Sequence, residues 1–188
     1  MIKAIITDFD GTLVDTFEAN LATYQKVLGD LGIVLTREKY RECFGLRFDA
    51  FMTAIGVNEE QVRNHIKEAK TDLYPSFFEN LTPNKVLIDF LLTMRAAGVK
   101  IAIASTARKE NLMNVLRYLK LENSFDLIMA GVNVSKGKPD PEIYTLTMSG
   151  LAVNPDEVLI FEDSEVGFQA AEASGAKYIK ITEEFFIK

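Results

Sequence analysis

The sequence predicts an α/β protein, with a parallel sheet covered by helices on both faces and a small all-helical cap inserted after the first strand. Short apolar, β-branched runs alternate with segments of helical periodicity, which is typical of strands joined by crossover helices. No convincing strand occurs between Asp15 and Leu81. Acidic and hydroxyl residues directly follow three of the apolar runs, where parallel sheets bind their ligands. The expected arrangement is therefore Rossmann-like.

The first part of the chain predicts one buried strand followed by helices. Lys3–Thr7 is short and apolar, and Gly11 and Thr12 then interrupt it. The next helix ends near Gly32 and carries apolar residues at steps of three and four, namely Phe17, Leu21, Tyr24, Leu28 and Leu31. Helix-prone, mostly polar sequence continues through residues 37–44, 48–55 and 59–73. Residues 16–80 are therefore expected to form the helical cap.

After Pro83 the pattern alternates between helices and strands. Helices are expected at Leu87–Met94, Leu112–Leu119, Pro139–Ser149 and Val166–Ser174. Strands are expected at Val99–Ala104, Phe125–Ala130, Val158–Phe161 and Tyr178–Ile181. We therefore predict a core domain formed by residues 1–15 and 81–188. The crossings between core and cap are expected near residues 11–16 and 77–83.

The composition argues against several classes of function. A net charge of −6 over 188 residues disfavours nucleic acid and anionic membranes as partners. No apolar run approaches the roughly 20 residues of a membrane span, and no signal peptide is visible before the first strand. The single cysteine, Cys43, allows no internal disulfide and fits a reducing compartment. We expect a cytoplasmic protein that is a monomer or a weak homodimer.

Three carboxylates at strand ends predict a site for a hard divalent cation. Asp8 and Asp10 follow the first strand, and Asp163 follows the strand at Val158–Phe161. Such carboxylates are costly unless they hold a metal or do chemistry, and an oxygen-rich site favours Mg²⁺. An unprotonated Asp8 could attack a bound phosphorus, with Asp10 acting as acid and base. The one histidine, His65, lies outside these motifs, which argues against histidine-based mechanisms.

A phosphate group would need positive charge and hydrogen-bond donors in this acidic chain. Ser105 or Thr106, which follow a predicted strand, could donate to a phosphate oxygen, and the sequence leaves the choice between them open. Lys138 could pair with both the phosphate and the carboxylate of Asp8. Lys136 is close enough to be the alternative, but it does not precede the pair of prolines. The expected partner is a small phosphate ester.

Four short motifs occur in order along the chain. They are Asp8-Phe9-Asp10-Gly11-Thr12-Leu13-Val14-Asp15, Ile101-Ala102-Ile103-Ala104-Ser105, Gly137-Lys138-Pro139-Asp140-Pro141-Glu142-Ile143-Tyr144 and Phe161-Glu162-Asp163-Ser164. The chain resembles the haloacid dehalogenase (HAD) superfamily, in the helical-cap subgroup of phosphoglycolate phosphatases and β-phosphoglucomutase-like phosphatases. The resemblance covers essentially the whole length, and four motifs with matching spacing are much more specific than one.

The resemblance implies roles for the matched residues. Asp8 matches the nucleophile that becomes an aspartyl-phosphate, and Asp10 matches the general acid and base. Ser105 and Lys138 match the phosphate-binding pair. Asp163 matches a Mg²⁺ ligand beside Asp8 and the backbone carbonyl of Asp10.

Two further residues are implied more indirectly. Glu162 matches a position that supports the metal site in some members of the superfamily. Gly45-Leu46-Arg47 resembles the loop through which the cap selects substrates, so Arg47 is expected to contact an anionic group or a sugar hydroxyl.

The resemblance also separates reaction classes. Asp10 disfavours the dehalogenases, which lack this carboxylate, and Thr53 stands where the phosphonate-cleaving branch has a lysine. Asn20 stands where the sugar-phosphate mutases have a histidine. Our first hypothesis is a Mg²⁺-dependent phosphatase for small metabolites such as a sugar phosphate or phosphoglycolate. The alternatives are a phosphomutase and a non-catalytic regulatory or partner-binding module on the same fold.

Overall fold

The structure, a computed structural model, describes residues 1–186 in two compact units. One unit comprises Met1–Asp15 and the chain from Thr82 onward, and the other comprises Thr16–Leu81. Ile187 and Lys188, which the predicted core domain includes, lie outside the described residues. Each unit has a hydrophobic core of its own, so each is described by itself.

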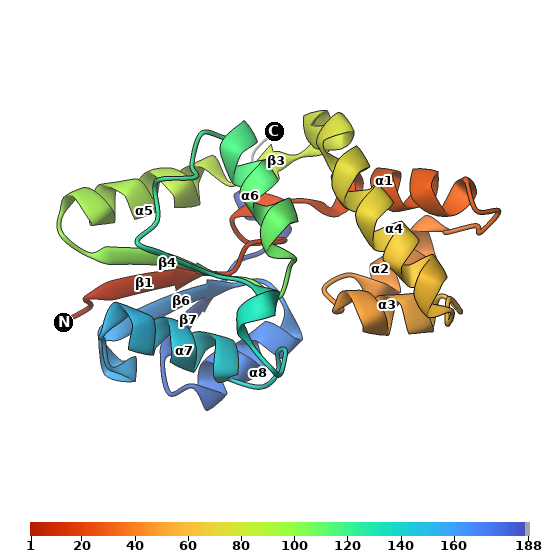
Figure 1. Cartoon of the computed structure of the whole chain (residues 1–188). Coiled ribbons are helices and arrows are strands. Elements are labelled where there is room, and N and C mark those ends of the chain that lie inside the picture. The colour runs from red at the N-terminus through yellow and green to blue at the C-terminus, as the bar shows by residue number, and fades with distance from the viewer. Residues whose placement is uncertain (187–188) are drawn as a thin grey trace. The chain divides into compact units, whose positions relative to one another are not determined.

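The first unit contains a five-stranded parallel sheet in the order β5-β4-β1-β6-β7 (Figure 1). Its strands are β1 (Ala4–Thr7), β4 (Lys100–Ala104), β5 (Leu127–Met129), β6 (Val158–Glu162) and β7 (Lys177–Lys180). In the centre, Ile5 pairs with Ile101 of β4 and with Leu159 of β6. The predicted parallel α/β fold is confirmed.

Helices cover both faces of this sheet. Figure 1 shows α5 (Lys85–Ala96) and α6 (Lys109–Tyr118) on one face, with α7 (Glu142–Leu151) and α8 (Glu165–Ala173) on the other. Alternate residues of a strand face opposite sides, so every second apolar residue of β1, β4 and β6 reaches the α7 and α8 face. The buried side chains there include Ala4, Ile6, Ala102, Ala104, Ile143, Tyr144, Val158 and Ile160.

The helix predicted from Pro139 begins later. α7 starts at Glu142, after Pro141, which occupies the N-cap position. A residue before a proline is disfavoured in the helical region, so Asp140 cannot extend the helix backwards. Residues 137–141 therefore form a loop at the edge of the sheet, and this loop carries Lys138.

A short antiparallel ribbon pairs the chain segment that leads into the second unit with the segment that leads out of it. The sequence does not predict this ribbon. β2 (Val14–Asp15) pairs with β3 (Thr82–Pro83). Asn84 follows directly and is fully buried; its backbone N–H donates to the Leu13 carbonyl at 2.9 Å and its side-chain amide to the Thr12 carbonyl at 3.2 Å. The ribbon thus holds both ends of the inserted segment and fixes the turn after β1.

The second unit, Thr16–Leu81, is built from helices joined by short loops. It comprises α1 (Phe17–Gly29), α2 (Arg37–Cys43), α3 (Phe48–Ala54), α4 (Glu60–Leu73) and a 3-10 segment, η1 (Tyr74–Asn80). Its core is rich in aromatic rings that meet edge to face or tilted, from Phe17, Tyr24, Tyr40, Phe44 and Phe51. Across residues 1–186, no helix is both long enough and apolar enough to span a bilayer.

Candidate active site

Asp8 lies at the carboxyl edge of the sheet, immediately after β1. Its backbone N–H donates to the Phe161 carbonyl of β6 at 2.9 Å, so the main chain is still held by the sheet at this point. Only 7% of the residue is exposed. Its Oδ1 accepts a hydrogen bond from the Nζ of Lys138 at 2.6 Å. A buried carboxylate in this position needs a charged partner, and Lys138 supplies it.

Lys138 reaches the site from the loop before α7. Its side chain is 6% exposed and pairs with both Asp8 and Glu162, while its Nζ lies 5.0 Å from the ring centre of Tyr144. Lys136, the alternative that the sequence leaves open, has a side chain 73% exposed and pairs with Asp140 at 3.4 Å. The geometry therefore selects Lys138 as the lysine of this site.

The loop that carries Lys138 is held by Glu142, the first residue of α7. The carboxylate of Glu142 accepts hydrogen bonds from the Ser135 N–H at 3.0 Å, the Ser135 hydroxyl at 2.8 Å and the Lys136 N–H at 2.7 Å. These bonds lower the pKa of Glu142, led by the bond from the Ser135 backbone. The loop is therefore tied to the helix on the N-terminal side of Lys138.

Glu162, the last residue of β6, is completely buried and has donors at both oxygens. Its Oε1 accepts from the Lys138 ammonium and from the Tyr144 hydroxyl, the latter at 3.0 Å. Its Oε2 accepts from the Asp163 N–H at 2.8 Å, the Ser164 N–H at 2.9 Å and the Ser164 hydroxyl at 3.0 Å. Five donors fix this carboxylate in one orientation.

Two glycines make room for the carboxylates of Glu162 and Asp163. A Cβ at Gly167 of α8 would lie 2.0 Å from Cδ of Glu162. A Cβ at Gly11 would lie 2.2 Å from Oδ2 of Asp163, and Gly11 also has a φ of +88°, which side chains rarely adopt. Thr12, beside it, donates from its hydroxyl to Oδ1 of Asp163 at 2.7 Å. The turn after β1 therefore packs closely against the loop after β6, through the contacts of Gly11 and Thr12 with Asp163.

Asp10 lies in this same turn and is half-buried. Its backbone forms an isolated bridge with Val14, and the neighbouring Gly11 N–H donates to the Val14 carbonyl at 2.8 Å. The charge of Asp10 contributes to raising the pKa of Asp163, so the two carboxylates influence each other. Asp8, Asp10 and Asp163 therefore share one electrostatic environment.

The site holds more negative than positive charge. Burial raises the pKa of Asp8 well above its usual range, and the Lys138 ammonium acts in the opposite direction. Burial also raises the pKa of Asp163 to about 6, against the hydrogen bond from Thr12. Burial acts to raise the pKa of Glu162 as well, but Lys138, the Ser164 N–H and the Tyr144 hydroxyl together outweigh it, so the pKa is lowered. Burial acts to lower the pKa of Lys138, but Asp8, Tyr144 and Glu162 together outweigh it, so the pKa is raised.

These residues fit a divalent metal ion. Asp8, Glu162 and Asp163 each offer a carboxylate oxygen, and these oxygens lie within 4.8 Å of one another. Three ionised carboxylates and one ammonium, from Lys138, leave two negative charges, which one divalent cation would balance. Carboxylate oxygens are the ligands that hard cations prefer. No other such group of acidic, histidine or cysteine side chains occurs among residues 1–186.

Ser105 and Thr106 follow β4 at the same edge of the sheet. Ser105 is 2% exposed, and its hydroxyl oxygen accepts from the Ala107 N–H at 3.1 Å, which leaves its own hydrogen available as a donor. Thr106 is half-buried. A Cβ at Gly131 would lie 2.4 Å from the Thr106 carbonyl oxygen, so this loop also packs tightly. Neither hydroxyl caps α6, whose N-cap residue is Arg108.

Arg47 belongs to the second unit. It precedes α3 as the N-cap residue, with an exposed side chain, in the loop after α2. Its expected contact with a substrate remains a prediction.

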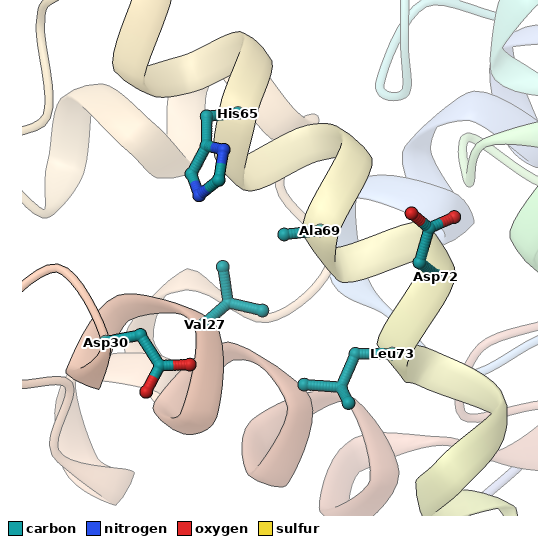
Figure 2. A pocket seen from close by; sticks show the side chains of 6 residues that line it. All are labelled: Val27, Asp30, His65, Ala69, Asp72 and Leu73. Atoms are coloured by element: carbon teal, nitrogen blue, oxygen red, sulfur yellow. The ribbon is translucent and has the colours of Figure 1, made fainter.

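A separate hollow of about 320 Å³ lies on the second unit, between α1 and α4 (Figure 2). Val27, Ala69 and Leu73 line it together with Asp30, His65 and Asp72. Asp30 already pairs with Lys26 of the same helix at 2.5 Å. This hollow holds none of the residues of the carboxylate site.

Comparison with known families decides the identity of this arrangement. Residues 5–181 match the family described as haloacid dehalogenase-like hydrolase. The chain belongs to this family. The resemblance carried by the four motifs is thereby confirmed. The residues grouped around Asp8 in this haloacid dehalogenase-like hydrolase, Lys138, Glu162 and Asp163, all belong to those motifs.

Three similar proteins show which members of the family this hydrolase resembles. It is 31% identical over 182 residues to a phosphorylated carbohydrates phosphatase of Thermotoga maritima, covering 95% of this chain and 84% of that protein. It is 28% identical over 184 residues to a beta-phosphoglucomutase of Bacillus subtilis, covering 93% and 80%. A crystal structure of CbbY from Rhodobacter sphaeroides, a mutant in complex with xylulose-(1,5)-bisphosphate, superposes with a TM-score of 0.84 at 27% identity, covering 95% and 85%. Family and relatives support a phosphoric monoester hydrolase.

The structure of this haloacid dehalogenase-like hydrolase adds residues to which the sequence assigns no role. Thr12 binds Asp163, and Tyr144 and Ser164 bind Glu162. Tyr144 leaves a signal in the sequence, because a tyrosine on the buried stripe of a helix needs a partner for its hydroxyl. That partner is Glu162 of β6, and it can be identified only from the structure.

Proposed function

We propose that the protein is a Mg²⁺-dependent phosphatase that hydrolyses small phosphorylated metabolites through an aspartyl-phosphate on Asp8. One observation carries the proposal. The buried Asp8 carboxylate lies against Lys138 at 2.6 Å, beside Glu162 and Asp163, at the sheet edge where parallel α/β proteins bind ligands. The family and the names of its relatives agree with this chemistry.

Each residue has a defined task in the proposed reaction. An oxygen of Asp8 attacks phosphorus, the ester P–O bond breaks, and the leaving oxygen takes a proton from Asp10. Asp10 then removes a proton from water, which attacks phosphorus and releases inorganic phosphate, so that Asp8 is regenerated. Lys138 holds the phosphate oxygens and orients Asp8. Ser105 or Thr106 donates a further hydrogen bond to the phosphate.

Mg²⁺ would be held by Asp8, by Asp163 and by the backbone carbonyl of Asp10, with Glu162 supporting them. When bound, it would supply positive charge that offsets the negative charge of the phosphate and of the carboxylates. Glu162 already meets five donors, which favours the supporting role for it.

The proposed substrates are sugar phosphates or similar small phosphate esters. The relatives named above act on phosphorylated carbohydrates or phosphoglucose by their names, and one neighbour binds a xylulose bisphosphate. The helical unit Thr16–Leu81 is proposed to serve as a cap that selects among them, with Arg47 as the contact to an anionic group or a sugar hydroxyl.

Phosphate release from a panel of small esters, with Mg²⁺ and with the metal chelated, tests the proposal. We expect release that requires the metal and that is faster with sugar phosphates than with simple aryl phosphates. Metal-independent release would contradict the mechanism, and so would a complete absence of turnover by the folded protein on every ester.

A phosphomutase is the second candidate, because a beta-phosphoglucomutase is among the relatives. The same aspartyl-phosphate would then transfer its phosphoryl group to a sugar hydroxyl rather than to water. Isomerisation of a hexose phosphate without release of free phosphate would favour this reaction. A non-catalytic role would be favoured only if neither hydrolysis nor transfer occurred.

A further inference from the structure

Tyr144 occupies a position in the site that the proposed reaction does not use. It is fully buried in the first turn of α7, six residues after Lys138 in the chain. Its ring belongs to the apolar core beneath the sheet, while its hydroxyl reaches Oε1 of Glu162 at 3.0 Å. The side chain therefore links the core to the charged cluster through one hydrogen bond.

The two ends of the Glu162 carboxylate meet different groups. Oε2 meets three donors from the two residues that follow β6. Two are backbone N–H groups and the third is the hydroxyl of Ser164. Oε1 meets only the ammonium of Lys138, at the end of a long side chain, and the hydroxyl of Tyr144. Of these two, Tyr144 has the stiffer side chain, with fewer rotatable bonds, so its hydroxyl is the group that fixes where Oε1 lies.

The Lys138 ammonium is placed by contacts on three sides. Asp8 and Glu162 bind it directly, and the ring of Tyr144 lies 5.0 Å from its Nζ. A shift of Oε1 would therefore draw Nζ away from Asp8. A neutral tyrosine hydroxyl can donate to Glu162 without adding charge to the cluster.

We propose that Tyr144 is a positioning residue for the reaction: its hydroxyl fixes Oε1 of Glu162, and Glu162 in turn directs the Lys138 ammonium onto Asp8. This inference rests on the proposed phosphatase function for its kinetic consequence. Its structural consequence, the position of Nζ, holds whatever the reaction is.

Tyr144→Phe tests the role directly, because it removes the hydroxyl and keeps the ring. We expect kcat to fall about tenfold, the loss typical of one hydrogen bond to a charged group. Tyr178→Phe on β7 is the matched control, since that ring stacks on Phe168 and its hydroxyl is not one of the five donors to Glu162. Tyr178→Phe should stay within twofold of the parent enzyme, and thermal melts would verify that both variants are folded.

Glu162→Gln shows whether Tyr144 acts through Glu162. An amide at this position cannot accept at both ends, so it disturbs the same network. If Tyr144 acts through Glu162, adding Tyr144→Phe to Glu162→Gln should cost less than about twofold. An equal tenfold loss in both backgrounds would mean that the two residues act independently, and the proposal would be overturned.

Crystal structures of the parent and of Tyr144→Phe give a readout that needs no turnover. We expect the distance between Nζ of Lys138 and Oδ1 of Asp8 to increase from 2.6 Å beyond hydrogen-bond range in the variant. An unchanged pair would overturn the positioning role even if the enzyme is a phosphatase. Absence of metal-dependent turnover in the parent protein would instead reject the proposed function, and the displaced ammonium would still support the role of Tyr144.

Discussion

At the scale of single residues, the site depends on the charges of Asp8 and Asp10. Asp8→Asn keeps the size of the side chain but removes the nucleophilic charge, so we expect turnover to fall by at least about a thousandfold in a protein that still folds. Asp10→Asn should also impair turnover severely, because no acid would protonate the leaving oxygen. Phosphate release and a circular dichroism melt measure the two effects. Near-normal rates for Asp8→Asn would reject the mechanism.

Gly167 offers a second test at this scale. Gly167→Ala would place a methyl group 2.0 Å from Cδ of Glu162, so the carboxylate would have to leave its donors. We expect a loss of about 2–4 kcal/mol in the free energy of unfolding and at least a tenfold loss of activity. Gly29→Ala in α1 is the control, because no atom lies within 4 Å of the added methyl group. It should be neutral or stabilising by up to about 1 kcal/mol. Equal stability of the two variants in urea would refute the packing argument.

At the scale of elements, the carboxylate of Glu142 holds the loop before α7. Its pKa is lowered, so its contribution to stability is present above the pKa of an unfolded glutamate and is lost as the pH falls through the lower, folded value. Glu142→Gln should therefore lower the melting temperature at pH 7.5, and the difference should shrink as the pH approaches 3. Glu172→Gln, an exposed change on α8, is the control. A difference that is constant with pH would exclude the charge as the cause.

The strands of the parallel sheet, and their order along the chain, were the most predictable elements. Apolar runs such as the one before Asp8 are long enough to show their character, and the residues after them mark the edge of the sheet. The ribbon of β2 and β3 could not be predicted, because two-residue strands have no period. The start of α7 was predicted too early, since the helical pattern continues back through Pro141 although the backbone cannot.

The candidate site was predictable only in part for a related reason. Asp8 and Asp163 could be named from their places after strands, and Lys138 from its place before a pair of prolines. The hydroxyls that hold them, from Thr12 and Tyr144, depend on contacts between segments far apart in sequence. Their roles follow from the fold, and a single sequence contains no pattern for such pairs.

At the scale of the whole molecule, metal binding should couple to stability and to pH. Burial raises the pKa of Asp163 to about 6, so without metal its ionisation opposes folding as the pH rises from about 4 through 6, by at most about 3 kcal/mol. Mg²⁺ binds the ionised form. A hundredfold excess of Mg²⁺ over its dissociation constant should therefore raise the melting temperature by about 5 °C or more at pH 7.5.

The same measurement at pH 5 provides the contrast. Protons then compete for Asp163, so the shift caused by the same concentration of Mg²⁺ should be much smaller. Asp163→Asn should abolish the shift at both pH values. Equal shifts at pH 5 and pH 7.5 would mean that Asp163 does not control the binding of the metal.

The ribbon has one further consequence, which concerns how such a chain can be shortened. Val14 pairs with Pro83 and Asp15 with Thr82, which is the register of a hairpin whose loop is the whole segment Thr16–Leu81. A two-residue Asn-Gly turn could close that hairpin in its place. The cost of closing a loop grows only slowly with its length, so exchanging the long segment for a short turn should change the closure cost of this hairpin little. The ribbon thus marks the point at which the helical segment is inserted. A core from which that segment has been removed should still fold around Asp8.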